Sequence, residues 1–267
     1  LPTVHLGQRD GAELLAWLRQ AGASARARIG PTEAASIPER ADILASFSSR
    51  GPVGTGLPKP NLSAPGVGIF AAAGTGSGAA TLSGTSMAAP HVSGAALLLK
   101  AERPGLSVDA LESLLQLSAL PTLRMPDTVT PAGLLDGGAG RLRVDVALTG
   151  NLFQPLANSV WGSAANLSAA ERQRSLNLPS IHSEACVGTC SFERRVRALS
   201  AGSWRAVTNL PAGVTLEVNP AEFTLAANAE QPLSITARID DPGKYGLLIG
   251  GSLRLEPLPG SSASVLA

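Results

Sequence analysis

The chain has 267 residues, of which 44% are hydrophobic and 15% are charged, and its formal net charge at neutral pH is +1. This length and hydrophobic content are sufficient for a sizeable buried core and for more than one globular domain. The near-neutral charge gives no indication of a nucleic acid or an anionic membrane surface as partner. The longest apolar stretch, residues 94–99, is much too short to cross a bilayer.

Residues 1–30 predict a strand, a helix and a second strand. Residues 4–6 alternate between apolar and polar side chains, as do residues 25–29, and such alternation is typical of strands. The segment between them, residues 11–22, carries four large apolar side chains at helical spacing: Leu14, Leu15, Trp17 and Leu18.

Residues 82–94 place a serine among small residues directly ahead of an apolar stretch. Gly84 and its small neighbours leave room for a substrate backbone beside Ser86. The apolar residues 95–99 predict a buried helix that begins near Ser86. Free N–H groups and the positive end of the helix dipole at such a terminus stabilise an oxyanion. The pattern predicts Ser86 as a catalytic nucleophile, with Gly84 and Thr85 next to the oxyanion and the substrate backbone.

A further helix is expected downstream. Ser107 and Asp109 are suited to the start of a helix, as the N-terminal cap and an acidic residue of the first turn. Its buried face would consist of leucines, namely Leu111, Leu114, Leu115 and Leu117. We expect this helix to pack on the same sheet as the serine helix.

The character of the sequence changes at about residue 151. Short alternating runs follow one another, separated by proline and glycine turns, at residues 192–199, 204–207, 214–218, 223–225, 233–239 and 253–255. Their spacing is typical of an all-β sandwich.

Three segments together resemble the subtilisin-like serine proteases, or subtilases. The serine motif of that family, Gly-Thr-Ser-Met-Ala-x-Pro-His-Val-x-Gly, is found at residues 84–94, and the runs at 45–52 and 59–67 lie upstream in the order and rough spacing of the family. The serine elbow of the α/β-hydrolases does not fit, because Ala88 stands where its second glycine is required. The resemblance implies an endopeptidase that cleaves protein or peptide substrates by acyl-enzyme catalysis, with Ser86 as the nucleophile.

The other catalytic residues of the family are not found in this sequence. Subtilases carry their triad in the order Asp, His, Ser. The histidines of the chain are His5, His91 and His182, and none lies in the family's His-Gly-Thr context. We therefore expect the chain to be the C-terminal portion of a longer protease, with Asp, His and the oxyanion-hole Asn upstream, and to be inactive alone. His91 is expected to be a packed structural histidine, because it lies five residues after Ser86 on one helix.

The resemblance also implies an α/β fold with a division into domains. Residues 1–30 would be the end of a protease-associated insert, with a plain αβ unit of the catalytic domain as the alternative. Residues 31–150 would be the C-terminal part of a parallel-sheet catalytic domain, closed by a glycine-rich turn at 133–140 and a short helix at 144–148. Residues 151–176 would be a linker. Residues 177–267 would form a fibronectin type III-like β-sandwich, truncated before its last strand.

The two cysteines, Cys186 and Cys190, are expected to form a disulfide in an exported protein. With His182 and Glu184 they form a His-x-Glu-x-Cys-x3-Cys cluster, but this spacing matches no standard zinc pattern. We expect no metal, no cofactor, no nucleic acid and no membrane as partner, and secretion from the cell. Two alternatives stay open: an inert module that binds protein or carbohydrate, and a non-enzymatic relative of the subtilases.

Overall fold

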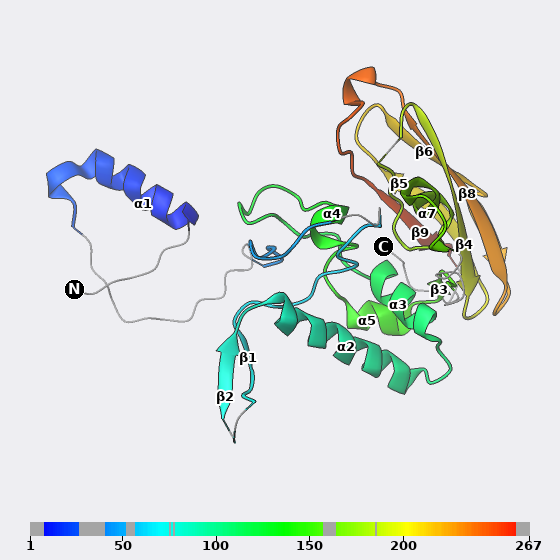
Figure 1. Cartoon of the computed structure of the whole chain (residues 1–267), viewed down its shortest axis with the longest axis horizontal. Coiled ribbons are helices and arrows are strands. Elements are labelled where there is room, and N and C mark those ends of the chain that lie inside the picture. Colours follow the sequence, from blue (N-terminus) through cyan, green and yellow to red (C-terminus); the bar gives the residue numbers. More distant parts are fainter. Residues whose placement is uncertain are drawn as a thin grey trace.

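The computed structural model describes residues 8–26, 41–51, 57–74, 76, 78–156, 164–184 and 186–259 of the chain. A mainly helical part with one projecting hairpin is followed by a second part built of two β-sheets (Figure 1). This mixture of helices and sheets agrees with the expected α/β class.

The helical part comprises α1 (Gln8–Ala21), the 3-10 turn η1 (Gly22–Ser24), the hairpin strands β1 (Ile69–Ala72) and β2 (Ala79–Leu82), and helices α2 (Thr85–Glu102), α3 (Val108–Leu117), α4 (Leu134–Gly137) and α5 (Val144–Thr149). The second part comprises β3 (Leu152–Phe153), α7 (Ala169–Ser175), β4 (Thr189–Ala198), β5 (Gly202–Asn209), β6 (Val214–Asn219), β7 (Glu222–Leu225), β8 (Glu230–Ile239), η3 (Pro242–Lys244) and β9 (Ser252–Pro257).

Helix α1 confirms the helix expected within residues 11–22. The strand expected at residues 4–6 lies outside the described residues, as does most of the one expected at 25–29. The four apolar side chains of the α1 stripe are exposed to between 38% and 54% of their full area. In the described part of the chain, this face of α1 is therefore largely uncovered.

Helices α2, α3 and α5 pack against one another around a small core. Leu99 of α2, Leu114 of α3 and Ala147 of α5 are fully buried in it. The prediction that α3 packs on the same sheet as α2 is not met among the described residues. The main contacts of α2 are with α3 and α5, whereas α3 packs on α2, α5 and β3. Parallel pairing is found there only as isolated bridges, between Ser63 and Arg141 and between Ile43 and Arg124.

Helix α2 begins where the sequence predicts, but it is not a buried helix. Ala95 and Leu99 are its buried residues, whereas Leu97 and Leu98 are 71% and 59% exposed. The apolar run winds around the whole helix, while α3 and α5 cover only one side of it. The expectation of a buried helix was wrong because composition alone does not show how many neighbours a helix has.

The second part consists of two packed antiparallel sheets. Strands β3, β4, β8 and β6 form one sheet in that order, and β7, β5 and β9 form the other. All six alternating runs of the sequence lie on these strands, because alternate side chains of a strand point to opposite faces. Strand β4 buries every second residue, and the core between the sheets contains Trp204 stacked on Phe223 at 5.9 Å.

Strand β3 connects the two parts, although it has only two residues. Leu152 belongs to the core between the sheets, and Phe153 belongs to the core of the helices. Both pair with β4, at Ala198 and Arg197 respectively. The segment expected to be a linker, residues 151–176, thus contributes β3 to a sheet and α7 to the surface of β4.

A buried arginine of β4 binds the segment between α7 and β4 through hydrogen bonds. The guanidinium of Arg194 donates five hydrogen bonds of 2.8–3.2 Å to backbone carbonyls, those of Gln173, Arg174, Leu178, Ser180 and Glu193. Burial lowers the pKa of Arg194 to about 10, so the side chain stays charged at neutral pH. One side chain therefore holds both the end of α7 and the loop that follows it.

Candidate active site

Ser86 is the second residue of α2 and is exposed. The helix starts after Gly84, whose carbonyl accepts hydrogen bonds from the N–H groups of Met87 at 3.0 Å and Ala88 at 3.3 Å. Among the described residues, the N–H groups of Thr85 and Ser86 have no acceptor. Both groups lie at the positive end of an 18-residue helix, where a developing negative charge is stabilised.

The turn that carries Ser86 is supported by the loop before the hairpin. Gly84 donates its N–H to the carbonyl of Gly66 at 2.8 Å, and Gly68 donates its N–H to the hydroxyl of Ser83 at 2.9 Å. Strands β1 and β2 pair from Ile69 with Leu82 outward, so the hairpin joins this loop directly to the serine turn. The two segments, 18 residues apart in sequence, are thus brought together beside Ser86.

His91 lies on the same helix as Ser86 but is exposed, so the prediction of a packed histidine was wrong. Its ring nitrogen Nδ1 lies 2.9 Å from the carbonyl oxygen of Met87, one helical turn earlier. His182 belongs to the second part of the molecule, and His5 lies outside the described residues. The described residues therefore bring no histidine from another segment to Ser86.

Cys186 and Cys190 form a disulfide at the start of β4, with their Cα atoms 5.6 Å apart. His182 precedes Cys186 by four residues and has its side chain 8% exposed, and its Nε2 atom has no hydrogen-bond partner among the described residues. Burial lowers the pKa of His182, while Glu184 at 3.9 Å opposes this shift. In the part of the chain that the structure describes, no three His, Cys, Asp or Glu side chains are grouped to hold a metal ion.

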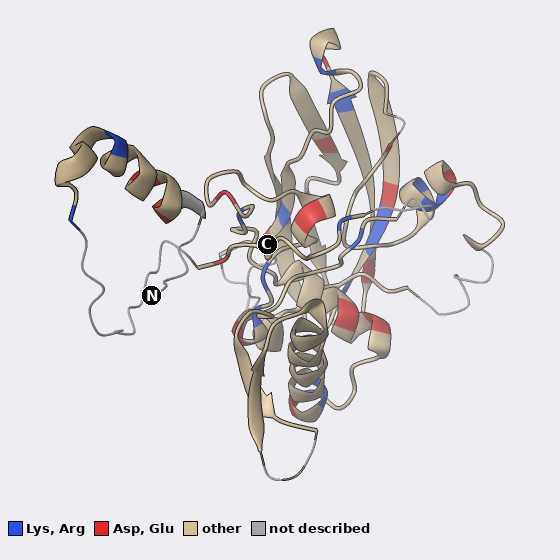
Figure 2. Cartoon of the chain, turned by 60° about the vertical axis from the view of Figure 1, so that its left-hand side comes forward, with Lys and Arg blue, Asp and Glu red and all other residues tan. Residues whose placement is uncertain are grey.

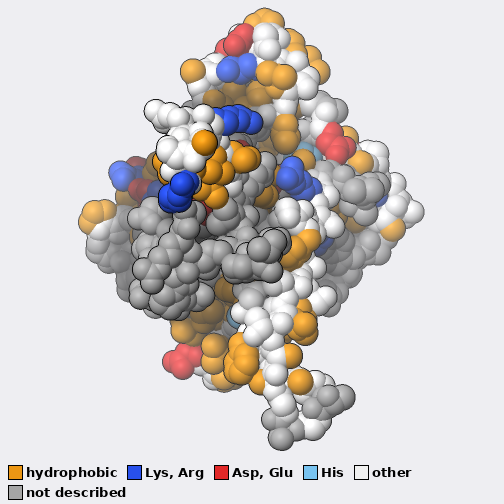
Figure 3. Space-filling model, turned by 90° about the vertical axis from the view of Figure 1, so that its left-hand side faces the viewer, with side chains coloured by type: hydrophobic (Ala, Val, Ile, Leu, Met, Phe, Trp, Pro, Cys, Tyr) orange, Lys and Arg blue, Asp and Glu red, His pale blue; other side chains and the backbone are white. Residues whose placement is uncertain are grey.

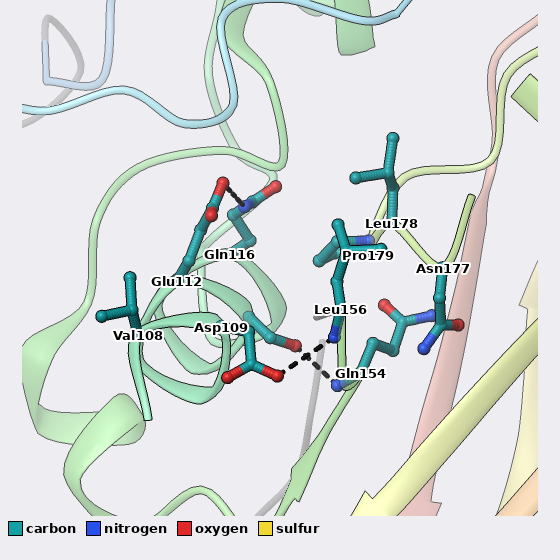
Figure 4. A pocket seen from close by; sticks show the side chains of 10 residues that line it. Val108, Asp109, Glu112, Gln116, Gln154, Leu156, Asn177, Leu178 and Pro179 are labelled. Atoms are coloured by element: carbon teal, nitrogen blue, oxygen red, sulfur yellow. Dashed lines mark hydrogen bonds between the residues drawn. The ribbon is translucent and has the colours of Figure 1, made fainter. Parts of the chain in front are cut away.

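A small pocket lies where α3 meets the second part of the molecule (Figure 4). Asp109 lines it and accepts a hydrogen bond from the N–H of Leu156 at 3.0 Å, while Ser113 accepts one from the N–H of Gln154 at 2.8 Å. Hydrogen bonding to Ser107 and to the backbone outweighs burial and lowers the pKa of Asp109. The volume of this pocket, about 40 Å³, is far below that of typical small-molecule sites. The hydrogen bonds of Asp109 and Ser113 therefore serve to join α3 to the second part of the molecule.

Acidic and basic residues are interspersed over the strands and are not gathered into one patch (Figure 2). Apolar side chains are found on several parts of the face drawn in Figure 3, among them the base of the projecting hairpin. The exposed large apolar side chains include Phe70 and Leu82 of the hairpin and Leu97 and Leu98 of α2, all more than half exposed. None of the described helices combines the length and apolarity needed to cross a membrane.

Comparison with known protein families gives a match that includes residues 82–94 and extends well beyond them. The model of the subtilase family, peptidase family S8, matches residues 22–157, which is about half of the chain. The chain therefore belongs to the subtilase family.

Individual relatives agree with this assignment. The subtilisin-like protease SBT2.3 of Arabidopsis thaliana is 28% identical over 257 residues, covering 77% of this chain and 30% of its own length. The CO(2)-response secreted protease of the same plant is 35% identical over 160 residues, covering 53% of this chain and 20% of its own. The minor extracellular protease Vpr of Bacillus subtilis (strain 168) is 30% identical over 148 residues, covering 53% and 18%. The chain thus spans less than a third of the length of these relatives.

Proposed function

We propose that this chain belongs to a subtilisin-type serine endopeptidase and that Ser86 is its nucleophile. The observation that carries the proposal is the placement of Ser86, exposed in the first turn of α2 next to N–H groups that have no acceptor among the described residues. Membership of the subtilase family supports the same reaction, because residues 84–94, which resemble the serine motif of that family, form the start of α2.

In this mechanism the Ser86 hydroxyl attacks the carbonyl carbon of the scissile peptide, and a histidine takes its proton. The negative oxygen of the tetrahedral intermediate accepts a hydrogen bond from the Ser86 N–H. The intermediate collapses to an acyl-enzyme as the amine leaves with the histidine proton, and water then releases the acyl group. Among the described residues, Ser86 has no hydrogen-bonded base. The histidine, its aspartate and the oxyanion-hole asparagine are therefore assigned to other residues of the complete protein.

The domain division follows as part of the same proposal. Residues 31–150 are assigned to the catalytic domain and residues 1–30 to the end of a protease-associated insert, supported by α1. The two antiparallel sheets support a fibronectin type III-like sandwich over residues 177–267. Because β3 and α7 pack with these sheets, the boundary of the sandwich is placed nearer to residue 151 than to residue 177.

Secretion is proposed on two observations. The names of two relatives describe a secreted and an extracellular protease. The disulfide between Cys186 and Cys190 fits an oxidising compartment.

The test compares two serines of the same helix in the complete protein. Ser86→Ala is expected to abolish casein hydrolysis and labelling by a fluorophosphonate probe, since loss of the nucleophile in subtilisin lowers kcat on the order of 10⁶-fold. Ser93→Ala is the control, because the one hydrogen bond of its exposed hydroxyl within the described part of the chain is to the carbonyl of Ala89, at 3.3 Å. Retained turnover in Ser86→Ala would refute the assignment.

The isolated 267-residue chain provides the second half of the test. Without a base the hydroxyl of Ser86 is a weak nucleophile, so we expect no hydrolysis and no labelling above background. Labelling of Ser86 in the isolated chain would show that no further histidine is needed.

A further inference from the structure

The loop at residues 66–68 contacts the serine turn more closely than any side chain would permit. A Cβ atom built on Gly66 would lie 2.9 Å from the carbonyl oxygen of Gly84 and 3.2 Å from the Cβ of Ala88. Real Cβ atoms essentially never come within 3.0 Å of another heavy atom. Position 66 therefore accepts only glycine unless the serine turn moves.

The atom that Gly66 approaches is the one on which the first turn of α2 is built. The carbonyl of Gly84 accepts the hydrogen bonds of Met87 and Ala88, which directly follow Ser86. The N–H of Gly84 in turn donates to the carbonyl of Gly66 at 2.8 Å. Gly84 is thus hydrogen-bonded to Gly66 through its N–H, and its carbonyl oxygen lies so close to Gly66 that no side chain fits between them, with Ser86 two residues away.

A second contact holds the same turn from the residue before it. Ser83 accepts a hydrogen bond from the N–H of Gly68 at 2.9 Å. Both residues are exposed, so neither is buried in a core. Their hydrogen bond instead fixes the distance between the loop and the turn.

We propose that Gly66 and Ser83 are positioning residues for Ser86, an inference that rests on the proposed function. They set the direction of the Ser86 N–H and hydroxyl by holding Gly84, without touching the substrate. Misplacing a reacting group by about 1 Å lowers a catalytic rate on the order of 100-fold. The rate of the chemical step is therefore sensitive to the identity of residue 66.

The experiment uses the complete protein and the variants Gly66→Ala, Ser83→Ala and Gly105→Ala. Gly66→Ala is expected to lower kcat on the order of 100-fold. Ser83→Ala is expected to lower kcat roughly three- to tenfold, as one hydrogen bond is lost. In both variants KM stays within about twofold, because the substrate contacts themselves are unchanged.

Gly105→Ala is the matched control, because a Cβ there meets no atom within 4 Å and the residue lies between α2 and α3. It is expected to retain the kcat, KM and melting temperature of the wild type. Unchanged kcat in Gly66→Ala, or losses of kcat that only follow a lower melting temperature, would overturn the inference. If Gly66→Ala does not fold, Ser83→Ala decides by the same criterion.

The outcome also separates this inference from the proposed function. A wild-type protein that neither hydrolyses peptides nor reacts with a fluorophosphonate refutes both. An active wild type together with fully active Gly66→Ala and Ser83→Ala refutes the positioning role alone.

Discussion

Arg194 shows how a single buried residue can organise a loop. It lies on β4 with 4% of its area exposed, yet four of its five hydrogen bonds are to carbonyl groups at the end of α7 and in the loop that follows. A buried charge is tolerated when its hydrogen-bonding groups are satisfied, and the planar guanidinium can satisfy several acceptors at once. The loop carbonyls in turn obtain donors without forming a strand.

We expect Arg194→Met to destabilise the protein by about 3 kcal/mol or more, because five carbonyls lose their donor. Arg195→Met is the control on the neighbouring position of β4. The Arg195 side chain is 61% exposed and lies 3.5 Å from Glu230, so its loss should cost at most about 1 kcal/mol. Denaturant unfolding of both variants measures the difference, and equal losses would contradict the role of Arg194.

His182 gives the molecule a predictable dependence on pH. Because burial lowers its pKa in the folded state, the unfolded chain binds a proton at higher pH than the folded chain does. The stability associated with neutral His182 is fully present above about pH 6.5, the ordinary histidine pKa, and falls as the pH drops below it.

The melting temperature of the wild type is expected to fall when the pH is lowered from about 7.5 to about 5.5, and the fall should be smaller in His182→Gln, because glutamine does not titrate in this range. Thermal unfolding of wild type and variant at both pH values measures the effect. An identical pH dependence in the two proteins would show that His182 does not contribute.

At the scale of the elements, the disulfide restrains the start of β4. Cys190 is 4% exposed in the core between the sheets, and Cys186 packs on the edge of that core. We expect a non-reduced digest to yield a single peptide that contains both residues and is lighter by two hydrogens than its reduced form in mass spectrometry. Replacing both by serine should cost less than about 3 kcal/mol, because the closed loop is short. Two free thiols would contradict the pairing.

The sheets were predictable from the sequence because their strands have one buried and one exposed face. The hairpin β1–β2 was not, since its residues are mostly small and exposed and show no clear alternation. Helix α7 was also missed, although the sequence carries a signal for it: Ser168 and Glu171 form a capping box, with hydrogen bonds of 2.7 Å and 3.2 Å.

The candidate site was predictable only in part, because some of its contacts join residues that are far apart in the sequence. The motif places Ser86 at a helix start, and α2 begins at Thr85. The role of Gly66 depends on its distance to Gly84 and Ala88 in space, and no local pattern reports that distance. The exposure of His91 likewise depends on what covers α2, which neither its neighbours nor its spacing reveals.

At the scale of the whole molecule, β3 couples the helices to the sheets. We expect Leu152→Ala and Phe153→Ala each to destabilise the protein by about 2–5 kcal/mol, since both side chains are buried. Hydrogen exchange should separate them: Leu152→Ala lowers protection mainly in β4 and β8, and Phe153→Ala mainly in α2 and α3. The same pattern for both variants would contradict a division between two cores.

This coupling limits how freely the two parts can be exchanged between relatives. The two sheets grafted onto the helical part of a relative must bring β3 with them, because Leu152 fills the core between the sheets. That helical part must then offer a cavity for Phe153 among its helices, as Leu99 and Leu114 do here. Recombination of such proteins should therefore succeed when the crossover lies before α2, and fail when it separates α2 from β3.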